Sequence, residues 1–194
     1  MIRRRMFQVS GVGLAGMGLA VAGALPLPVQ AQPEAVAPAE LEAYFASVET
    51  MQGGFVQEVR DEDGVLLELS RGRFWIARPD RFRWSYQTPF PQEIVADGES
   101  LFIHDVELEQ LTVRAQSDAL GSGPAVLLSG DLESLHSAFE LTVDGDWVVL
   151  TPRDSDWAMI DMRILFDGGA PATLNLVDGL GQSTLIDLQG VLLN

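Results

Sequence analysis

The sequence of 194 residues contains no cysteine and no lysine, and it has only two histidines. Without cysteine the chain can form neither a disulfide nor a thiolate metal site. It also cannot carry a lipid on an N-terminal cysteine. The chain is therefore not itself a lipoprotein, and whatever holds its fold together is non-covalent.

The motifs of common enzymes are missing as well. Neither a Gly-x-Ser-x-Gly elbow nor a P-loop pattern occurs, and His104 and His136 do not have metal-ligand spacing. Asp105, Glu107 and Glu109 beside His104 could bind a metal by chance, but solvated acids at a strand end explain them more simply. We expect no enzyme and no cofactor.

Residues 1–31 have the pattern of a cleaved export signal. Three arginines at positions 3–5 precede a largely apolar stretch over residues 6–27, and Val29-Gln30-Ala31 forms a small-residue cleavage site. The glycines and prolines of this stretch disfavour a membrane-spanning helix. Arg4-Arg5-Met6-Phe7 also resembles the twin-arginine pattern, so general secretory and twin-arginine export both remain open. We expect a periplasmic protein.

Cleavage leaves 163 residues, enough for one domain with a continuous core. This mature chain has nine arginines against 28 acidic residues, a formal charge of −19. Such a balance argues against nucleic acid and bare anionic membrane as partners. It favours either a basic protein partner or simply a well-solvated surface.

The mature chain begins with a Pro- and Ala-rich segment, residues 32–39, which we expect to be mobile, and the domain follows over residues 40–194. Its first apolar residues recur with the spacing of one helix face at Leu41, Tyr44, Phe45, Val48 and Met51. The sequence predicts an amphipathic helix here that ends at Gly53-Gly54.

Short β-like runs separated by turn residues fill most of the remaining chain. The first group predicts seven consecutive strands at residues 55–60, 65–69, 73–77, 82–87, 92–96, 101–104 and 110–114. The second group predicts five more at residues 139–143, 147–152, 159–166, 172–177 and 183–188. Hairpin signals occur at Asp144-Gly145-Asp146, Asp167-Gly168-Gly169 and Asp178-Gly179.

Residues 116–137 interrupt the strands with helix signals. Ser117 and Asp131 are suitable N-caps, Pro124 suits a first helical turn, and Gly130 suits a helix end. We expect two or three short helices in this segment.

A sheet of 11–12 antiparallel strands cannot stay flat, because strand twist makes large sheets curl. Curling leaves a concave face that needs a cover, and the N-terminal helix and the central helices can supply it. The sequence therefore predicts a mainly β fold with a helical lid, an open antiparallel half-barrel. A sandwich of two equal sheets would give little reason for the helical interruption.

The richest segment for function lies at residues 72–86. Side chains alternate between the two faces of a strand, so Phe82, Trp84 and Tyr86 share one face, while Arg81 and Arg83 lie on the other. These aromatic residues form either the wall of a binding cavity or ordinary core, and ordinary core is the commoner role of such a face.

Several motifs of this chain resemble the LolA family of outer-membrane lipoprotein carriers. The central one is Arg73-Phe74-Trp75-Ile76-Ala77-Arg78-Pro79-Asp80-Arg81-Phe82-Arg83-Trp84, an aromatic strand, an Arg-Pro turn and a Phe-Arg-Trp strand. Others follow in the family's order: Phe55-Val56-Gln57, Ile94-Val95-Ala96-Asp97-Gly98 with Leu101-Phe102-Ile103-His104-Asp105, Leu108-Glu109-Gln110-Leu111-Thr112-Val113, and Gly123-Pro124-Ala125-Val126-Leu127-Leu128.

The resemblance implies an open barrel whose apolar cavity receives the acyl chains of lipoproteins, with no cofactor. The residues expected to line the cavity are Phe45, Phe55, Trp75, Phe82, Trp84, Tyr86, Phe102, Leu127 and Leu128. In the family an arginine of the Arg-Pro turn holds the lid closed by hydrogen bonding to backbone carbonyls. Arg78 matches it, and the matching carbonyls are those of Phe45, Leu128 and Ser129.

The partners implied by the resemblance are acylated lipoproteins, an inner-membrane ATP-driven lipoprotein-releasing complex, which Phe82 is expected to contact, and an outer-membrane receptor lipoprotein. We expect a monomer. A periplasmic domain of the same fold that senses lipid or lipoprotein and regulates signalling is the alternative function. Family members usually continue beyond the position of Asn194, so the tail is either absent here or cut off, and a paralogue with another lipid cargo stays possible.

Overall fold

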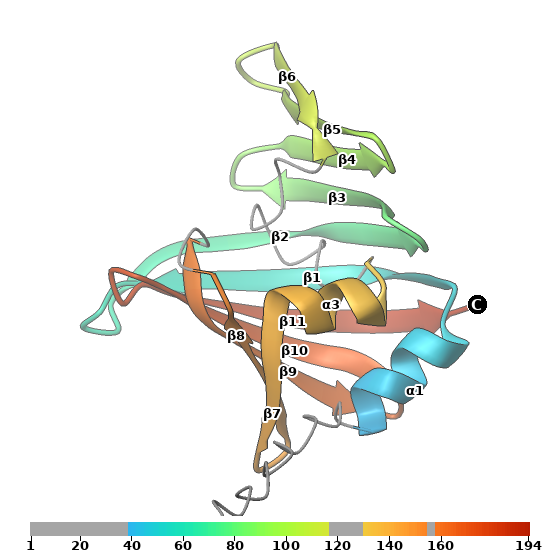
Figure 1. Ribbon diagram of the computed structural model, residues 1–194. Coiled ribbons are helices and arrows are strands. Elements are labelled where there is room, and N and C mark those ends of the chain that lie inside the picture. The colour runs from blue at the N-terminus through green and yellow to red at the C-terminus, as the bar shows by residue number, and fades with distance from the viewer. Residues whose placement is uncertain (1–38, 117–129, 155–157) are drawn as a thin grey trace, which may run out of the picture. The chain divides into compact units, whose positions relative to one another are not determined.

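The described residues form one antiparallel sheet of eleven strands with two helices (Figure 1). The structure is a computed structural model that describes residues 39–116, 130–154 and 158–194. The helices are α1 (Ala39–Ser47) and α3 (Leu132–Ala138). The strands are β1 (Thr50–Arg60), β2 (Leu66–Ala77), β3 (Arg81–Thr88), β4 (Gln92–Asp97), β5 (Ser100–Asp105), β6 (Gln110–Ala115), β7 (Phe139–Asp144), β8 (Trp147–Pro152), β9 (Met159–Asp167), β10 (Ala170–Asp178) and β11 (Ser183–Leu193).

The sheet is built from two meanders that meet at β1. Its strand order is β6-β5-β4-β3-β2-β1-β11-β10-β9-β8-β7, so β1 pairs with β2 on one side and with β11 on the other. The two outer strands, β6 and β7, follow one another in the sequence. They lie at opposite ends of the strand order and no pairing joins them among the described residues, so the sheet is open, as the sequence predicted.

The N-terminal helix is shorter than the sequence predicted. It ends at Ser47, and Met51 already belongs to β1. Leu41, Tyr44 and Met51 are all buried in the same core, so the apolar spacing continues although the backbone has changed from helix to strand. The prediction of a helix to Gly53-Gly54 was wrong because residues facing one core can keep helical spacing across such a change.

Strand β2 joins two runs that the sequence predicted as separate strands, residues 65–69 and 73–77. Gly72 lies between them and continues the pairing with Phe55 of β1. A Cβ at Gly72 would lie 2.0 Å from the Ser85 carbonyl oxygen and 2.6 Å from Cζ of Phe55. This glycine therefore permits close approach inside one long strand and does not mark a break.

The other predicted strands are confirmed, with ends that shift by a few residues. The largest shifts are in β1, which begins at Thr50 instead of Phe55, and in β11, which continues to Leu193 instead of ending at Leu188. The extension of β11 pairs with the start of β1, where the Asn194 side-chain oxygen accepts hydrogen bonds from the N–H groups of Glu49 (2.8 Å) and Thr50 (3.2 Å). The long β1–β11 pair therefore joins the two meanders along its full length.

The helix α3 begins at the N-cap that the sequence predicted, Asp131. Its carboxylate accepts hydrogen bonds from the Ser134 N–H (2.8 Å) and the Ser134 hydroxyl (2.7 Å). The other helix signals, at Ser117 and Pro124, lie outside the described residues, as do the predicted signal peptide and all of the predicted leader except Ala39, the first residue of α1.

The core lies between the sheet and the two helices, on the face that we call the inner face. Figure 1 shows α1 and α3 in front of this face. Leu41 and Tyr44 from α1 and Leu135 from α3 are buried against the strands. The largest strand residues buried here are Phe55, Phe74, Trp84, Phe139, Leu101, Leu150, Met162 and Ile164. One continuous core therefore supports both meanders.

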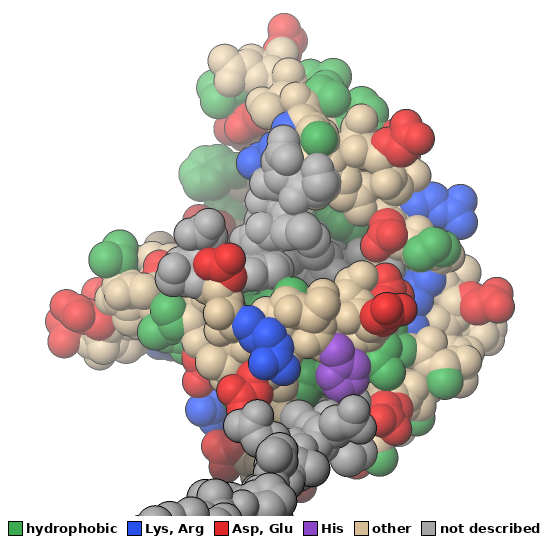
Figure 2. Space-filling view, viewed as in Figure 1, with side chains coloured by type: hydrophobic (Ala, Val, Ile, Leu, Met, Phe, Trp, Pro, Cys, Tyr) green, Lys and Arg blue, Asp and Glu red, His purple; other side chains and the backbone are tan. Residues whose placement is uncertain are grey.

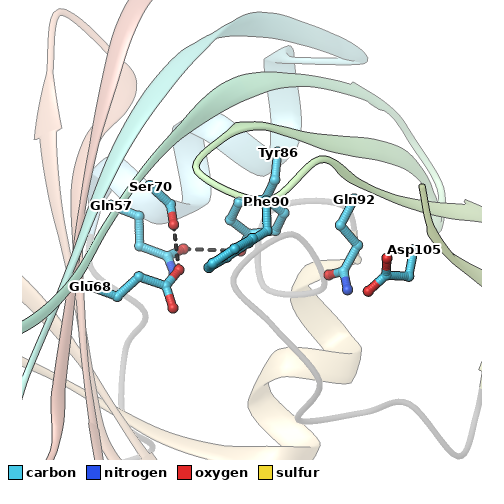
Figure 3. A pocket seen from close by; sticks show the side chains of 7 residues that line it. All are labelled: Gln57, Glu68, Ser70, Tyr86, Phe90, Gln92 and Asp105. Atoms are coloured by element: carbon cyan, nitrogen blue, oxygen red, sulfur yellow. Dashed lines mark hydrogen bonds between the residues drawn. The ribbon is translucent and has the colours of Figure 1, made fainter. Parts of the chain in front are cut away.

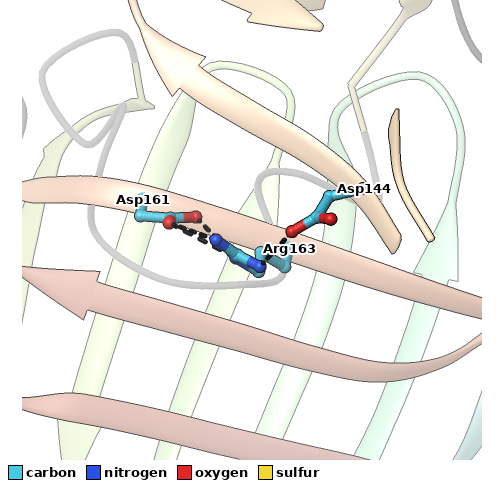
Figure 4. Close-up of polar contacts among 3 residues, drawn as sticks. All are labelled: Asp144, Asp161 and Arg163. Atoms are coloured by element: carbon cyan, nitrogen blue, oxygen red, sulfur yellow. Dashed lines mark hydrogen bonds and ion pairs between the residues drawn. The ribbon is translucent and has the colours of Figure 1, made fainter. Parts of the chain in front are cut away.

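Charged side chains lie around this core. Figure 2 shows acidic side chains spread over the visible face, with few arginines among them. On β9, Arg163 pairs with Asp161 of its own strand and with Asp144 at the end of β7, both at 3.0 Å (Figure 4). Exposed ion pairs of this kind contribute only about 0–1 kcal/mol. They orient the outer strand more than they stabilise it.

Candidate functional site

The inner face of the first meander carries a continuous apolar surface. Residues paired across neighbouring strands share a face, and the row Phe74–Trp84–Ile94–Ile103 crosses β2 to β5. A second row runs beside it through Met51, Ile76, Phe82, Ala96 and Leu101. We call these two rows, together with Phe55, the apolar zone.

Aromatic rings stack at the centre of the apolar zone. The Trp84 ring lies 4.4 Å from the Phe55 ring and 5.5 Å from the Phe74 ring, measured between centroids. Tyr86 meets Phe55 edge to face at 5.2 Å. Only 2% of Trp84 is exposed, and within the described part of the chain its indole N–H has no hydrogen-bond acceptor. The stacked rings are therefore shielded from solvent in this structure.

A polar pocket of about 380 Å³ adjoins the apolar zone (Figure 3). Its lining comes from five consecutive strands and the β3–β4 turn: Gln57, Glu68, Ser70, Tyr86, Phe90, Gln92 and Asp105. The Tyr86 hydroxyl donates to Oε1 of Gln57 at 3.0 Å, and the Ser70 hydroxyl donates to Glu68. Burial raises the pKa of Tyr86, so its phenol stays protonated and remains a donor.

Arg78 connects the β2–β3 turn to α1. Its guanidinium donates to the Tyr44 carbonyl at 3.2 Å. The same group lies 4.0 Å from the ring centroid of Tyr44 and 4.1 Å from that of Phe45. Burial lowers the pKa of Arg78 and raises that of Tyr44, and the attraction between the two groups opposes both shifts. The contact is therefore both a hydrogen bond and a cation–π interaction.

The resemblance implied the carbonyl of Phe45 as the acceptor, and the acceptor that the structure places on α1 is one residue earlier. Consecutive residues of a helix lie about 100° apart around its axis, so their carbonyls occupy different sides of the helix. Phe45 contributes its ring instead. The two other expected acceptors, Leu128 and Ser129, lie outside the described residues.

The turn that carries Arg78 also lies close to α3. Burial raises the pKa of Asp80, and the negative charge of Asp131 raises it further. On the other side of the turn, the Asp80 carbonyl accepts a hydrogen bond from the Gln116 side chain at 2.7 Å. The turn between β2 and β3 therefore contacts α1, adjoins the N-cap of α3 and accepts a hydrogen bond from Gln116, the first residue after β6.

Two residues expected in the cavity lie on the other face of the sheet. Trp75 pairs with Gln52 and Arg83, and Phe102 pairs with Val95 and Val113. Each is the direct neighbour of a buried inner residue, Phe74 or Leu101, and side chains alternate along a strand. Their assignment to the same cavity as Trp84 was wrong, because it followed aromatic character and not strand alternation.

On that outer face Trp75 lies beneath two arginines. The guanidinium carbons of Arg73 and Arg83 lie 5.3 and 5.5 Å from its ring centroid. At the strand ends, a groove of about 560 Å³ reaches from Trp75 to Phe82 of the inner face and to Leu192. Phe82 therefore borders an opening, whereas Trp84 does not.

The remaining predicted site residues divide in two groups. Phe45, Phe55, Phe82, Trp84 and Tyr86 are brought together on α1 and the inner face. Leu127 and Leu128 lie outside the described residues. Sequence reasoning missed the polar pocket, although its signal was present as polar residues two positions from apolar ones on the same strand face.

Two further findings concern the described ranges 39–116, 130–154 and 158–194. No cluster of three or more His, Asp or Glu side chains there is suited to hold a metal ion. None of the helices described there has the length and apolar character needed to cross a bilayer.

Comparisons with known proteins agree with this geometry. The family model described as outer membrane lipoprotein carrier protein LolA matches residues 46–194. Proteins named outer-membrane lipoprotein carrier protein are similar in sequence: one from Halorhodospira halophila is 51% identical over 154 residues (79% of this chain, 74% of that protein), and one from Alkalilimnicola ehrlichii is 46% identical over 166 residues (85% and 77%).

The fold has solved counterparts. The crystal structure of a LolA superfamily protein from Nitrosomonas europaea superposes with a TM-score of 0.52 at 13% identity, covering 80% of this chain and 92% of that one. At this identity the likeness concerns the fold alone. Because the family model covers most of the chain and the sequence relatives agree with it, the chain belongs to the outer membrane lipoprotein carrier protein LolA family.

Proposed function

We propose that this chain is a periplasmic carrier. It binds the acyl chains of lipoproteins released from the inner membrane and delivers them to an outer-membrane receptor lipoprotein. The observation that carries the proposal is the apolar zone, a wide apolar surface with stacked aromatic rings at its centre, on the inner face of an open sheet. Each acyl CH₂ that it covers contributes about 0.8 kcal/mol, so a carrier must cover most of a chain.

Phe45, Phe55, Phe82, Trp84 and Tyr86 are the acyl contacts in this proposal, together with Leu127 and Leu128. Trp75 and Phe102 are left out because they face away. Since Phe55 and Trp84 are buried in this structure, cargo can reach them only when the helices move off the inner face. In this proposal the buried arrangement of Phe55 and Trp84 is the closed form of the carrier.

Arg78 holds the closed form in this scheme. Its described support is the bond to the Tyr44 carbonyl and the two aromatic rings of α1, and the carbonyls of Leu128 and Ser129 are its further acceptors in the proposal. A few hydrogen bonds worth about 0.5–1.5 kcal/mol each can close the lid when it is empty and yield when acyl chains enter.

The donor of cargo is an inner-membrane ATP-driven lipoprotein-releasing complex, which supplies the energy that the carrier lacks. Phe82 is the proposed contact with that complex, and its support is the groove at the strand ends, which Phe82 borders. The carrier acts as a monomer.

The test is release of an acylated lipoprotein from spheroplasts by the purified mature protein. We expect the lipoprotein to appear in the medium in a one-to-one complex that stays soluble without detergent. A version of the same lipoprotein without its acylated cysteine is the matched control and should not bind. No release at all would contradict the carrier function and favour a sensor of lipid or lipoprotein with the same fold.

A further inference from the structure

The inner face changes from apolar to polar at the same level on five consecutive strands. Two residues beyond an apolar residue on the same face stands a polar one: Phe55 precedes Gln57 on β1, and Ile103 precedes Asp105 on β5. On β3 and β4 the distance is again two residues, from Trp84 to Tyr86 and from Ile94 back to Gln92. On β2 it is four residues, from Phe74 back to Ser70. The strand register brings the polar residues together, since Tyr86 pairs with Gln92 and Gln92 with Asp105.

The polar residues form the pocket in Figure 3, and acceptors outnumber donors in it. Among its described lining residues are two carboxylates, Glu68 and Asp105, and no arginine. The Tyr86 and Ser70 hydroxyls are already donated inside the pocket, to Gln57 and to Glu68. One oxygen of Asp105 accepts the Leu108 N–H at 2.9 Å, which leaves its second oxygen for a ligand. The amides of Gln57 and Gln92 can both donate and accept, whereas the two carboxylates only accept, so a ligand with N–H donors and positive charge is favoured.

An acyl chain does not suit this end of the face, because covering carboxylates and amides with hydrocarbon removes them from water without replacing their hydrogen bonds. A single ligand with acyl chains at one end and donors at the other matches both surfaces. Lipoproteins have this composition, since their acylated anchor continues directly into peptide.

We propose that the pocket of Gln57, Glu68, Ser70, Tyr86, Gln92 and Asp105 binds the first peptide residues after the acylated anchor and prefers basic side chains there. This inference rests on the proposed carrier function and adds a cargo preference to it. The acyl chains occupy the apolar zone, and the peptide leaves across the polar end of β1 to β5.

Binding of synthetic lipopeptides tests the preference. The probes are a triacylated cysteine followed by Ser-Lys-Lys, Ser-Gln-Gln or Ser-Glu-Glu, competed against one fluorescent acyl probe on the mature protein. We expect the Lys peptide to bind about three- to tenfold more tightly than the Gln peptide, the size expected for two partly exposed charge pairs, and the Glu peptide to bind most weakly.

The variant Glu68→Gln/Asp105→Asn should bring the Lys and Gln peptides to equal affinity, because it removes the negative charge that favours lysine. Asparagine keeps the oxygen that accepts the Leu108 N–H, so the turn after β5 is preserved. Glu99→Gln/Glu107→Gln removes the same charge from exposed positions outside the pocket and should keep the preference.

The outcomes separate this inference from the carrier function. Equal binding of all three peptides to the unmodified protein overturns the preference but leaves the carrier function standing. If Glu99→Gln/Glu107→Gln abolishes the preference for the Lys peptide as fully as the pocket variant does, the inference is also overturned. The preference would then come from the net negative charge of the protein and not from the pocket. Failure of every lipopeptide to bind would count against the carrier function itself.

Discussion

Arg78 shows how one residue can serve two purposes at the boundary between sheet and helix. It is the first residue after β2, its N–H donates to the Glu49 carbonyl at 2.9 Å, and its guanidinium contacts α1. If α1 moves away from the sheet, the Arg78 guanidinium has to leave the Tyr44 and Phe45 rings, so this contact must be able to break. Such a residue is a candidate for control of opening more than for stability.

Arg78→Leu should therefore leave cargo uptake intact and slow delivery, because the closed empty form loses its hydrogen bond and its cation–π contacts. The measurement is transfer of a labelled lipoprotein from the carrier to the outer-membrane receptor. Arg78→Lys keeps the charge but not the planar fork and should fall between the two. Transfer by Arg78→Leu at the unmodified rate would remove the latch role.

Trp84 is the residue whose role the sequence left undecided between cavity wall and core. Stacked between Phe55 and Phe74, it is core in the closed form, so Trp84→Ala should lower the free energy of unfolding by about 3–5 kcal/mol. Trp84→Phe should cost less, since it also removes the indole N–H that has no acceptor among the described residues. Urea unfolding measures both.

Trp75→Ala is the matched control for Trp84, one strand away on the opposite face. Its ring is only half-buried under arginines, so its loss should cost clearly less than that of Trp84. Equal costs for the two tryptophans would mean that the inner stack is not the centre of the core.

At the scale of elements, the packing of β2 between β1 and β3 depends on Gly72. A methyl group there would lie 2.0 Å from the backbone oxygen of Ser85, which a side-chain adjustment cannot relieve. Gly72→Ala should therefore lower the free energy of unfolding by at least about 1–3 kcal/mol, the usual cost of overpacking. Thermal unfolding of the mature protein measures it.

Gly54 offers the control, because it lies on the neighbouring strand β1 and a Cβ there would find its nearest atom at an ordinary 3.6 Å. Gly54→Ala should be neutral or stabilising by about 0.4–1 kcal/mol, since alanine restricts the unfolded chain. If both glycines tolerate alanine equally, the close approach at Gly72 is not a constraint on the β2–β3 pair.

The helix α3 depends on its N-cap. Asp131→Ala should lower stability by about 0.5–2 kcal/mol. Hydrogen bonds from Ser134 lower the pKa of Asp131, so the stabilisation is complete above the ordinary carboxyl pKa and disappears as the pH falls through the lowered value. The difference between the two proteins should therefore vanish in acid. Glu133→Gln, which removes a charge of the same helical turn but no cap, should have the smaller effect, and the reverse order would exclude capping.

The sequence predicted an element correctly where the signal for that element was local. Turn residues such as Gly145 and Gly168 marked the hairpins correctly. Glycine adopts a positive φ readily because it has no Cβ, and this preference can be read from the local sequence. Gly72 misled because its role is a tertiary contact with Phe55 and Ser85. The face of Trp75 could be read from alternation with Phe74. The polar positions of the pocket could be read in the same way on each strand, but only the register shows that Glu68 and Asp105 lie on one surface.

At the scale of the whole molecule, strand number and twist were enough to predict an open, curled sheet under helices. They could not predict that β1 lies at its centre, because the pairing of β1 with β11 joins residues more than a hundred positions apart. That pairing gives the carrier two meanders of different character. The first holds the apolar zone and the polar pocket, and the second completes the core beneath α1 and α3.

The charge of the mature chain is the other property of the molecule as a whole. Nine arginines face 28 acidic residues, so the folded state concentrates like charges, and the few ion pairs, such as Arg83 with Glu93 at 2.7 Å, are exposed. At 0.1 M salt, repulsion between surface charges more than about 10 Å apart is largely screened. Raising NaCl from about 10 to 150 mM should therefore raise Tm by about 2–4 °C, which for a domain of this size corresponds to about 1 kcal/mol. KCl should act equally, because screening depends on ionic strength and not on the cation. A fall in Tm would mean that the ion pairs of Arg83 and Arg163 contribute more to stability than the repulsion among the acidic residues takes away. The acidic surface would then not lower the stability of the fold.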